Sequence, residues 1–201
     1  MPAWGRLSVG ADAAGRWLAR SWPLLFAVSP LGIGQAGVEF TPSDIGSPVL
    51  AGGTLSVPGG VDVTGAGKTI GGASDQFQFG WQERSGNFDV QARVEEVTVT
   101  DAFLQAGLMA RESLDGNARF AAAFASSPQL GSYFGWRATV GSSTSNAAPR
   151  GGFPVNYPHT WLRLQRVGNT FAGYASLDGR TWTQLGSATL TGLSTAARTV
   201  A

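Results

Sequence analysis

The sequence contains no cysteine and very few basic side chains other than arginine, with one histidine, His159, and one lysine, Lys68. The lack of cysteine excludes disulfide bonds, thiolate metal sites and a cysteine nucleophile. A serine–histidine–aspartate site would have to use His159, which follows Tyr157-Pro158 where a loop leads into a strand, and no Gly-x-Ser-x-Gly nucleophile motif occurs. We therefore expect His159 to be a loop residue.

Long apolar runs are also missing. The longest apolar stretch, 22–33, has about 12 residues and contains two prolines, whereas a membrane-spanning helix needs roughly 20. It follows Arg16 and Arg20 and precedes Gly34-Gln35-Ala36, a small-x-small cleavage pattern. Residues 1–36 are therefore predicted to be a secretory signal peptide, with residues 37–201 exported to the periplasm or the medium. The alternative is a buried N-terminal helix.

Charge is scarce as well, because charged residues make up 13% of the chain. Removing residues 1–36 would leave 11 basic and 12 acidic side chains, a net charge of −1. Phosphate binding needs a basic surface, so a nucleic-acid partner is disfavoured.

What the sequence has in abundance is glycine, 29 residues of it, between short runs of alternating apolar and polar residues. Period-2 runs separated by turn residues are typical of strands, and spacings of 8 to 12 residues indicate a sandwich or barrel. The polar, Gly/Pro-rich segment 141–154 is expected to be a long loop. The predicted strands are Thr54–Val57, Phe77–Glu83, Phe88–Val99, Phe103–Glu112, Arg119–Ala125, Tyr133–Val140, Thr160–Arg166, Thr170–Leu177 and Thr181–Leu185.

The last three of these strands predict a three-stranded meander. The turns between them are Val167-Gly168-Asn169 and Asp178-Gly179, and an Asp-Gly pair between alternating runs favours a type I′ hairpin. In the strand that begins at Thr160, Leu162 and Leu164 share one face, while Trp161 and Arg163 share the other. One face is expected to pack against the core, and the other to present an aromatic ring and a cation.

Several segments resemble bacterial secreted concanavalin-like modules of the DUF1349 and laminin-G-like type. The resemblance lies in Asp44–Gly46, Gly65–Gly67, Asp75–Phe79, Ala106–Glu112 and Trp161–Trp182, in the family's order along the chain. It implies an all-β fold of two antiparallel sheets packed as a jelly-roll sandwich, and binding of carbohydrate or a cell-surface ligand. The residues expected to be buried are Phe77, Phe79, Val90, Val94, Leu108, Phe120, Leu162, Leu164 and Phe171.

In one respect the sequence departs from that family. Similar domains continue through a further strand, and a final strand pairs near the segment that matches Asp44–Gly46, whereas this chain stops at Ala201. The last strand or strands are therefore expected to be missing, which leaves an open sheet edge beside residues 44–49. A partner strand that completes the sheet is one alternative, and a shortened gene product is the other.

Motifs for catalysis are weak. Retaining glycosidases need two carboxyl groups about 5.5 Å apart, but Glu95-Glu96 point to opposite faces of a strand, and Glu112 and Asp115 straddle a turn. The segment 65–69 imitates the end of a phosphate-binding loop but lacks its first glycine, and 176–182 resembles a single sialidase Asp-box, one residue short. We predict a binding module rather than an enzyme, with a glycoside hydrolase of the same fold as an alternative.

Two kinds of site remain as candidates. Flat aromatic rings and planar polar groups suit a sugar, and the candidates are Trp81, Gln105, Arg111, Tyr133, Trp136, Trp161, Arg163 and Tyr174. The alternative is that Trp161 and Trp182 belong to the core or cover a sheet edge and that Arg111 pairs with a carboxylate such as Glu112 or Asp75. Asp75, Asp101 and Asp178 are candidate Ca²⁺ ligands or, alternatively, turn residues that bond their own backbone. The predicted partners are a carbohydrate or cell-surface glycan and other domains of a secreted assembly, and a protein–protein adhesion module is the competing prediction.

Overall fold

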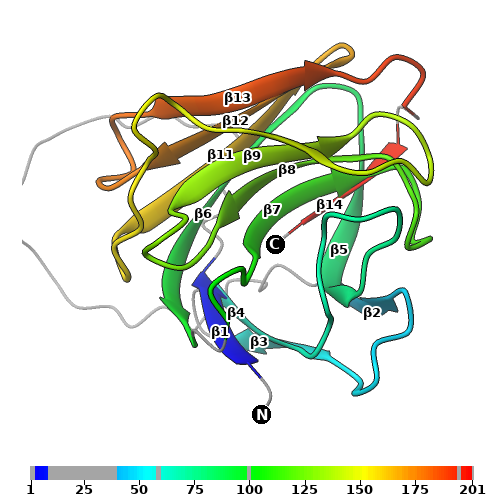
Figure 1. The fold of residues 1–201 in the computed structure, drawn as a ribbon, viewed down its shortest axis with the longest axis horizontal. Coiled ribbons are helices and arrows are strands. Elements are labelled where there is room, and N and C mark those ends of the chain that lie inside the picture. The colour runs from blue at the N-terminus through cyan, green and yellow to red at the C-terminus, as the bar shows by residue number, and fades with distance from the viewer. Residues whose placement is uncertain (1–2, 9–39, 58–59, 99–100, 194–195, 201) are drawn as a thin grey trace, which may run out of the picture.

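The computed structural model of the chain describes residues 3–8, 40–57, 60–98, 101–193 and 196–200 (Figure 1). These residues contain no helix and are 53% strand, which confirms the all-β prediction. The strands are β1 (Ala3–Ser8), β2 (Thr41–Ile45), β3 (Gly53–Val57), β4 (Gly60–Gly65), β5 (Phe77–Ser85), β6 (Phe88–Val97), β7 (Ala106–Arg111), β8 (Phe120–Ala125), β9 (Ser132–Arg137), β10 (Ser145–Ala147), β11 (Thr160–Val167), β12 (Thr170–Ser176), β13 (Thr183–Thr189) and β14 (Ala196–Val200).

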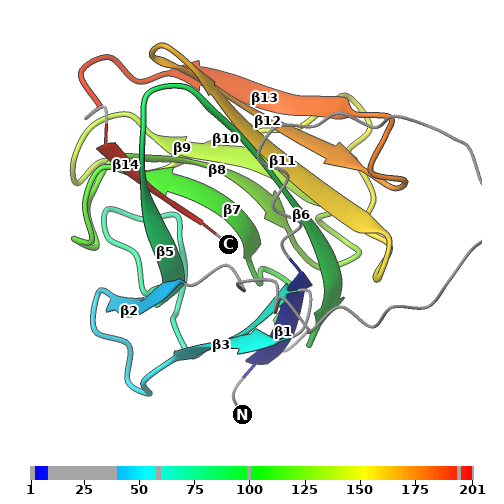
Figure 2. The same cartoon turned by 180° about the vertical axis from the view of Figure 1, so that it is seen from behind.

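The strands form two sheets. The first sheet has the order β13-β12-β11-β6-β1-β4-β3, and the second has the order β10-β9-β8-β7-β14-β5-β2. Neighbouring strands run antiparallel. The two views in Figures 1 and 2 show β11, β12 and β13 stacked against β7, β8 and β9, so the architecture is that of a β-sandwich.

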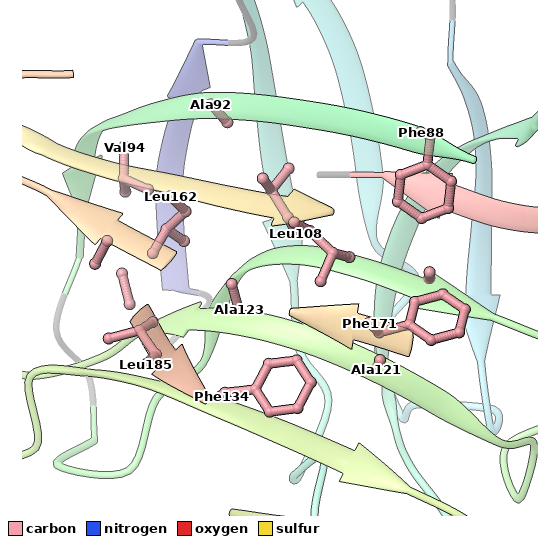
Figure 3. Close-up of a cluster of buried hydrophobic side chains, with 14 of the residues drawn as sticks. Phe88, Ala92, Val94, Leu108, Ala121, Ala123, Phe134, Leu162, Phe171 and Leu185 are labelled. Atoms are coloured by element: carbon pink, nitrogen blue, oxygen red, sulfur yellow. The ribbon is translucent and has the colours of Figure 1, made fainter. Parts of the chain in front are cut away.

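The main core lies between the two sheets, because one side chain in two along each strand points into that space. Leu162 and Leu164 of β11 are fully buried there, opposite Leu108 of β7 and Phe134 of β9 (Figure 3). A Cβ atom built on Gly173 of β12 would lie 2.6 Å from Cδ2 of Phe134. A larger residue at position 173 would therefore push the Phe134 ring out of its place between the sheets.

The second sheet is buried on both faces at its centre, where every residue of β8 is buried. Ala121, Ala123 and Ala125 face the core between the sheets, whereas Phe120 and Phe124 belong to a second apolar cluster. That cluster includes Ile45 and Ile70, which lie on β2 and in the segment between β4 and β5. Solvent-exposed residues of this sheet lie toward its margins, in β2, β10 and the last three residues of β5.

The predicted core is largely confirmed, because seven of its nine residues are buried. Phe77 and Val90 are only half-buried. The meander of β11, β12 and β13 is present, and Gly168-Asn169 forms its first tight turn. The predicted type I′ turn at Asp178-Gly179 is wrong, because pairing resumes only between Ala175 and Thr183 and the connection spans residues 177–182.

Several strands were not predicted, namely β2, β4, β10, β14 and β1. β10 is a short strand inside the segment 141–154 that was expected to be a loop. β14 lies between β5 and β7, so the end of the chain supplies an inner strand of the second sheet, and β2 is an edge strand of the same sheet. Most of the predicted signal peptide lies outside the described residues. Its described part, Ala3–Ser8, is β1, which pairs with β4 and β6.

Candidate functional site

Three of the eight predicted sugar-binding residues come together on the outer face of the first sheet. On β11, Leu162 and Leu164 point into the core, so Trp161 and Arg163 point to the opposite face. The register sets Arg163 beside Tyr174 of β12, and Trp161 beside Arg93 of β6. Side chains that are directly opposite on neighbouring strands share a face, so these residues belong to one surface.

Arg163 is the centre of this surface. Its Nε donates a hydrogen bond to Oδ1 of Asp89 at 2.7 Å, and its Nη2 donates to Oδ2 of the same carboxylate. Its guanidinium carbon lies 5.5 Å from the ring centre of Tyr174 and 5.7 Å from that of Trp182. The hydrogen bond with Asp89 raises the pKa of Arg163. The side chains of Arg163 and Asp89 remain 24% and 37% exposed, so a ligand can reach both.

Trp161 lies beside this centre and is held by two neighbours. The guanidinium carbon of Arg93 lies 5.7 Å from the Trp161 ring centre, and Arg93 also forms an ion pair with Glu95. The turn between β12 and β13 packs against the same indole, because a Cβ atom on Gly179 would lie 3.0 Å from Cε2 of Trp161. Gly179 also has a φ of +68°, so glycine is favoured there for both reasons.

Amide side chains complete the surface. Gln91 pairs with Arg163 in the β6–β11 register, and Gln165 donates a hydrogen bond to Oδ2 of Asp89 at 3.2 Å. Half-buried rings beside amides and a carboxylate offer both the flat apolar face and the planar hydrogen-bonding groups that a pyranose ring needs. We call this surface the outer-face patch, defined by Asp89, Gln91, Arg93, Glu95, Trp161, Arg163, Gln165, Tyr174 and Trp182.

Sequence reasoning missed the β6 side of the patch. Asp89, Gln91 and Arg93 precede β11 by about seventy residues, and only the sheet order reveals that β6 is the neighbour of β11. Trp182 was considered only as a core or edge-covering residue. Its position three residues after Gly179, in the turn that follows the strand of Tyr174, was the available signal that it could face the same side as Tyr174.

The other five predicted sugar-binding residues lie on the second sheet or beside it. Gln105 donates to the backbone oxygen of Ile70 and to the hydroxyl of Tyr133, at 2.8 Å in each case, and accepts from the Ile70 backbone N–H. It therefore fixes the segment that covers the second cluster. Burial raises the pKa of Tyr133. Trp81 donates to Oγ of Ser43 at 3.0 Å, and Trp136 stacks on Phe134 with ring centres 5.6 Å apart.

Arg111 belongs to a fully buried ionic cluster with Asp75 and Arg137. Its Nη1 donates to Oδ2 of Asp75 at 3.1 Å, and Arg137 donates to Oδ2 at 2.8 Å and to Oδ1 at 2.6 Å. None of the three side chains is exposed to solvent. Burial lowers the pKa of Arg111, against the opposing effect of Asp75. The pairing with Asp75 is one of the two that the alternative interpretation had named, and it places Arg111 out of reach of a ligand on the surface.

The three candidate Ca²⁺ ligands lie apart and have internal partners. Asp75 is part of the buried cluster, and Asp101 accepts the backbone N–H of Phe103 at 2.7 Å. Asp178 accepts the backbone N–H groups of Arg180 and Thr181 at 2.8 and 2.7 Å, and these bonds lower its pKa. Asp101 and Asp178 thus have the geometry of turn residues that bond their own backbone. Within the described ranges, no group of three or more His, Cys, Asp or Glu side chains could hold a metal ion.

The part of the chain that the structure describes includes no helix that is long and apolar enough to cross a membrane. Comparisons with protein-family models, curated proteins and solved structures gave no match to the chain. The resemblance to concanavalin-like modules therefore stays a prediction, and the contacts of the outer-face patch are the observations from which a function can be argued.

Proposed function

We propose that the protein is a non-catalytic binding module whose outer-face patch recognises carbohydrate. The observation that carries this proposal is the arrangement around Arg163, which is held by Asp89 and lies over the rings of Tyr174 and Trp182 while staying partly exposed. Fixed planar groups lose little conformational freedom when a ligand binds, so such a surface is organised before the ligand arrives.

The finer features of the proposal follow the sequence. The two sheets are proposed to have the jelly-roll topology of concanavalin-like modules of the DUF1349 and laminin-G-like type, a class found in bacterial secreted proteins. Residues 1–36 are proposed to be a signal peptide that directs the chain to the periplasm or the medium, and its cleavage would remove β1 from its place between β6 and β4 in the first sheet. Export would bring the patch into contact with cell-surface or extracellular glycans. Sequencing the N-terminus of the exported chain tests the cleavage.

Hydrolysis of the glycan is disfavoured by the spacing of the acidic side chains in the patch. Asp89 and Glu95 are six residues apart on β6, which corresponds to about 20 Å at a rise of about 3.3 Å per residue. Retaining and inverting glycosidases place their two carboxyl groups about 5 to 9.5 Å apart. Both carboxylates are, in addition, engaged by arginines.

A protein–protein adhesion role is the second candidate, and a different part of the surface favours it. Val49, Leu50 and Leu55 are 89%, 57% and 65% exposed, and they lie on β3 or just before it. β3 is an edge strand of the first sheet. Uncharged edge strands with exposed apolar side chains are suited to pairing with another chain.

A polysaccharide pull-down and glycan array with the purified full chain separates these candidates. We expect binding to at least one glycan class, and a loss of about tenfold or more in Trp161→Ala and Arg163→Ala at unchanged melting temperature. Phe103→Ala is the matched control, because Phe103 is an aromatic residue that is 73% exposed before β7, outside the patch.

Three other results would count against this proposal or favour another function. Release of reducing sugar by a contaminant-free sample would favour the hydrolase. Equal losses in Trp161→Ala and Phe103→Ala would remove the patch from the binding site. Concentration-dependent self-association without glycan binding would favour adhesion.

A further inference from the structure

The positive and negative charges of the outer-face patch cancel, because each charged side chain is paired with a neighbour of opposite charge. Its two cations, Arg93 and Arg163, are each paired with a carboxylate of β6, Glu95 and Asp89 respectively. The patch therefore carries no net charge, although it contains two arginines. A basic surface that attracts an anionic glycan needs cations in excess of carboxylates.

Asp89 occupies the edge of the Arg163 guanidinium that the carboxylate of an acidic sugar would need. It takes both Nε and Nη2 of Arg163, which is the paired-donor edge with which arginine binds carboxylates and sulfates most strongly. Asp89 also accepts from Gln165, so its own position is fixed by two residues of β11. A ligand carboxylate would have to displace Asp89 and would then lie beside its negative charge.

We propose that the outer-face patch selects uncharged glycans, and that Asp89 is the residue that excludes acidic ones by occupying Arg163. This inference rests on the proposed carbohydrate-binding function and adds the class of ligand. Neutral sugars need no displacement, because their C–H faces stack on aromatic rings and their hydroxyl groups bond to amides and carboxylates that are already in place. Here Tyr174 and Trp182 provide the rings, and Gln91, Gln165 and Asp89 provide the polar groups.

Binding of the full chain to two sets of soluble polysaccharides tests the proposal. The neutral set is hydroxyethyl cellulose, xylan and galactomannan, and the acidic set is polygalacturonate and heparin, each measured in 50 mM and 500 mM NaCl. We expect the wild-type chain to bind a member of the neutral set with little dependence on salt and to bind the acidic set at least tenfold more weakly. Asp89→Asn should gain about tenfold in affinity for polygalacturonate at low salt, and the gain should disappear at high salt.

Glu112→Gln is the matched control. Glu112 forms a similar two-bond pair with Arg119, which precedes β8 in the second sheet, and the side chains are comparably exposed at 28% and 17%. The substitution changes the net charge by the same amount as Asp89→Asn but frees an arginine outside the patch. We expect no gain for polygalacturonate. The double variant Asp89→Asn/Arg163→Gln should lose the gain for polygalacturonate, because the gain depends on Arg163.

The possible results test the proposed selectivity for uncharged glycans separately from the proposed carbohydrate binding. A wild-type chain that binds acidic glycans as well as neutral ones would overturn the selectivity while leaving carbohydrate binding intact. An equal gain in Glu112→Gln, or a gain that survives in the double variant, would overturn the role of Asp89. A folded wild-type chain that binds neither set would overturn both the proposed function and this inference.

Discussion

Two arginine–aspartate groups lie on opposite sheets of this molecule, and they differ mainly in burial. At the second sheet, Arg111 of β7 and Arg137 of β9 share Asp75, which precedes β5, and all three side chains are inaccessible to solvent. In the first sheet, Asp89 and Arg163 are partly exposed. The same chemical pair therefore has two uses, because a buried pair can act only on its own chain whereas an exposed pair can also meet a ligand.

The guanidinium groups of the buried cluster find hydrogen-bond acceptors in the backbone around them as well as in Asp75. Arg137 donates to the backbone oxygens of Gly72, Ala118 and Ser142 as well as to Asp75, and Arg111 donates to those of Ser113 and Asp115. These oxygens belong to three separate connecting segments, so the cluster fixes loops that have no regular structure of their own. Its carboxylate also offsets one of the two buried positive charges.

The largest effect is expected from Asp75→Asn. The change removes the carboxylate that bonds both buried guanidinium groups, and losing one partner of a buried ion pair costs about 3 to 5 kcal/mol of unfolding free energy. The matched surface change Asp89→Asn should cost less than about 1 kcal/mol. Urea denaturation of both variants measures the difference. Equal losses would show that burial does not distinguish the two groups.

A smaller difference is expected inside the buried cluster. Arg137 bonds both carboxylate oxygens of Asp75, whereas Arg111 bonds only one. In Arg111→Met the carboxylate keeps both bonds from Arg137, so we expect a loss of about 2 kcal/mol. Arg137→Met should cost at least about 1 kcal/mol more, because it frees more acceptors. Urea midpoints in the reverse order would mean that Arg111 provides the dominant contact.

The sequence predicts which face a side chain occupies much better than it predicts the neighbours of that side chain. The alternation in Thr160–Arg166 correctly places Leu162 and Leu164 in the core, because the period of a strand is local. The partner strand on the far side of β11 is β6, and that pairing depends on the path of the whole chain. The bond between Arg163 and Asp89 could therefore not be predicted from spacing.

Arg111 and Glu112 illustrate the same limit at closer range. Both Glu112 and Asp75 were considered as partners of Arg111, and the alternation of β7 separates the two candidates. Arg111 faces the second cluster with Asp75, while the next residue, Glu112, bonds Arg119.

Glycine-rich turns set a further limit. An Asp-Gly pair predicts a two-residue hairpin, but Asp178 instead caps the backbone N–H groups of a longer connection.

The smallest predicted effect concerns Glu112 and pH. The hydrogen bond from Arg119 lowers the pKa of Glu112 from its usual value near 4.5, so the folded chain favours the carboxylate more than the unfolded chain does. A group whose pKa is lowered on folding contributes stability above its unfolded pKa and loses that contribution as pH falls through the folded pKa. Because both side chains are partly exposed, the contribution should stay below about 1 kcal/mol.

Comparing the unfolding free energies of the wild-type chain and Glu112→Gln between pH 7 and pH 3 isolates this term, because all other titrating groups are common to both chains. We expect a constant difference from pH 7 to about pH 5.5 that then shrinks as the medium becomes more acidic, since protonation makes the glutamic acid resemble glutamine. Adding 1 M NaCl at pH 7 should also reduce the difference, because salt screens exposed pairs. A difference that grew toward low pH would show that the pair does not favour the folded carboxylate. If salt did not change this free-energy difference, the pair of Glu112 and Arg119 would behave like the buried cluster around Asp75 and not like the exposed pair of Asp89 and Arg163.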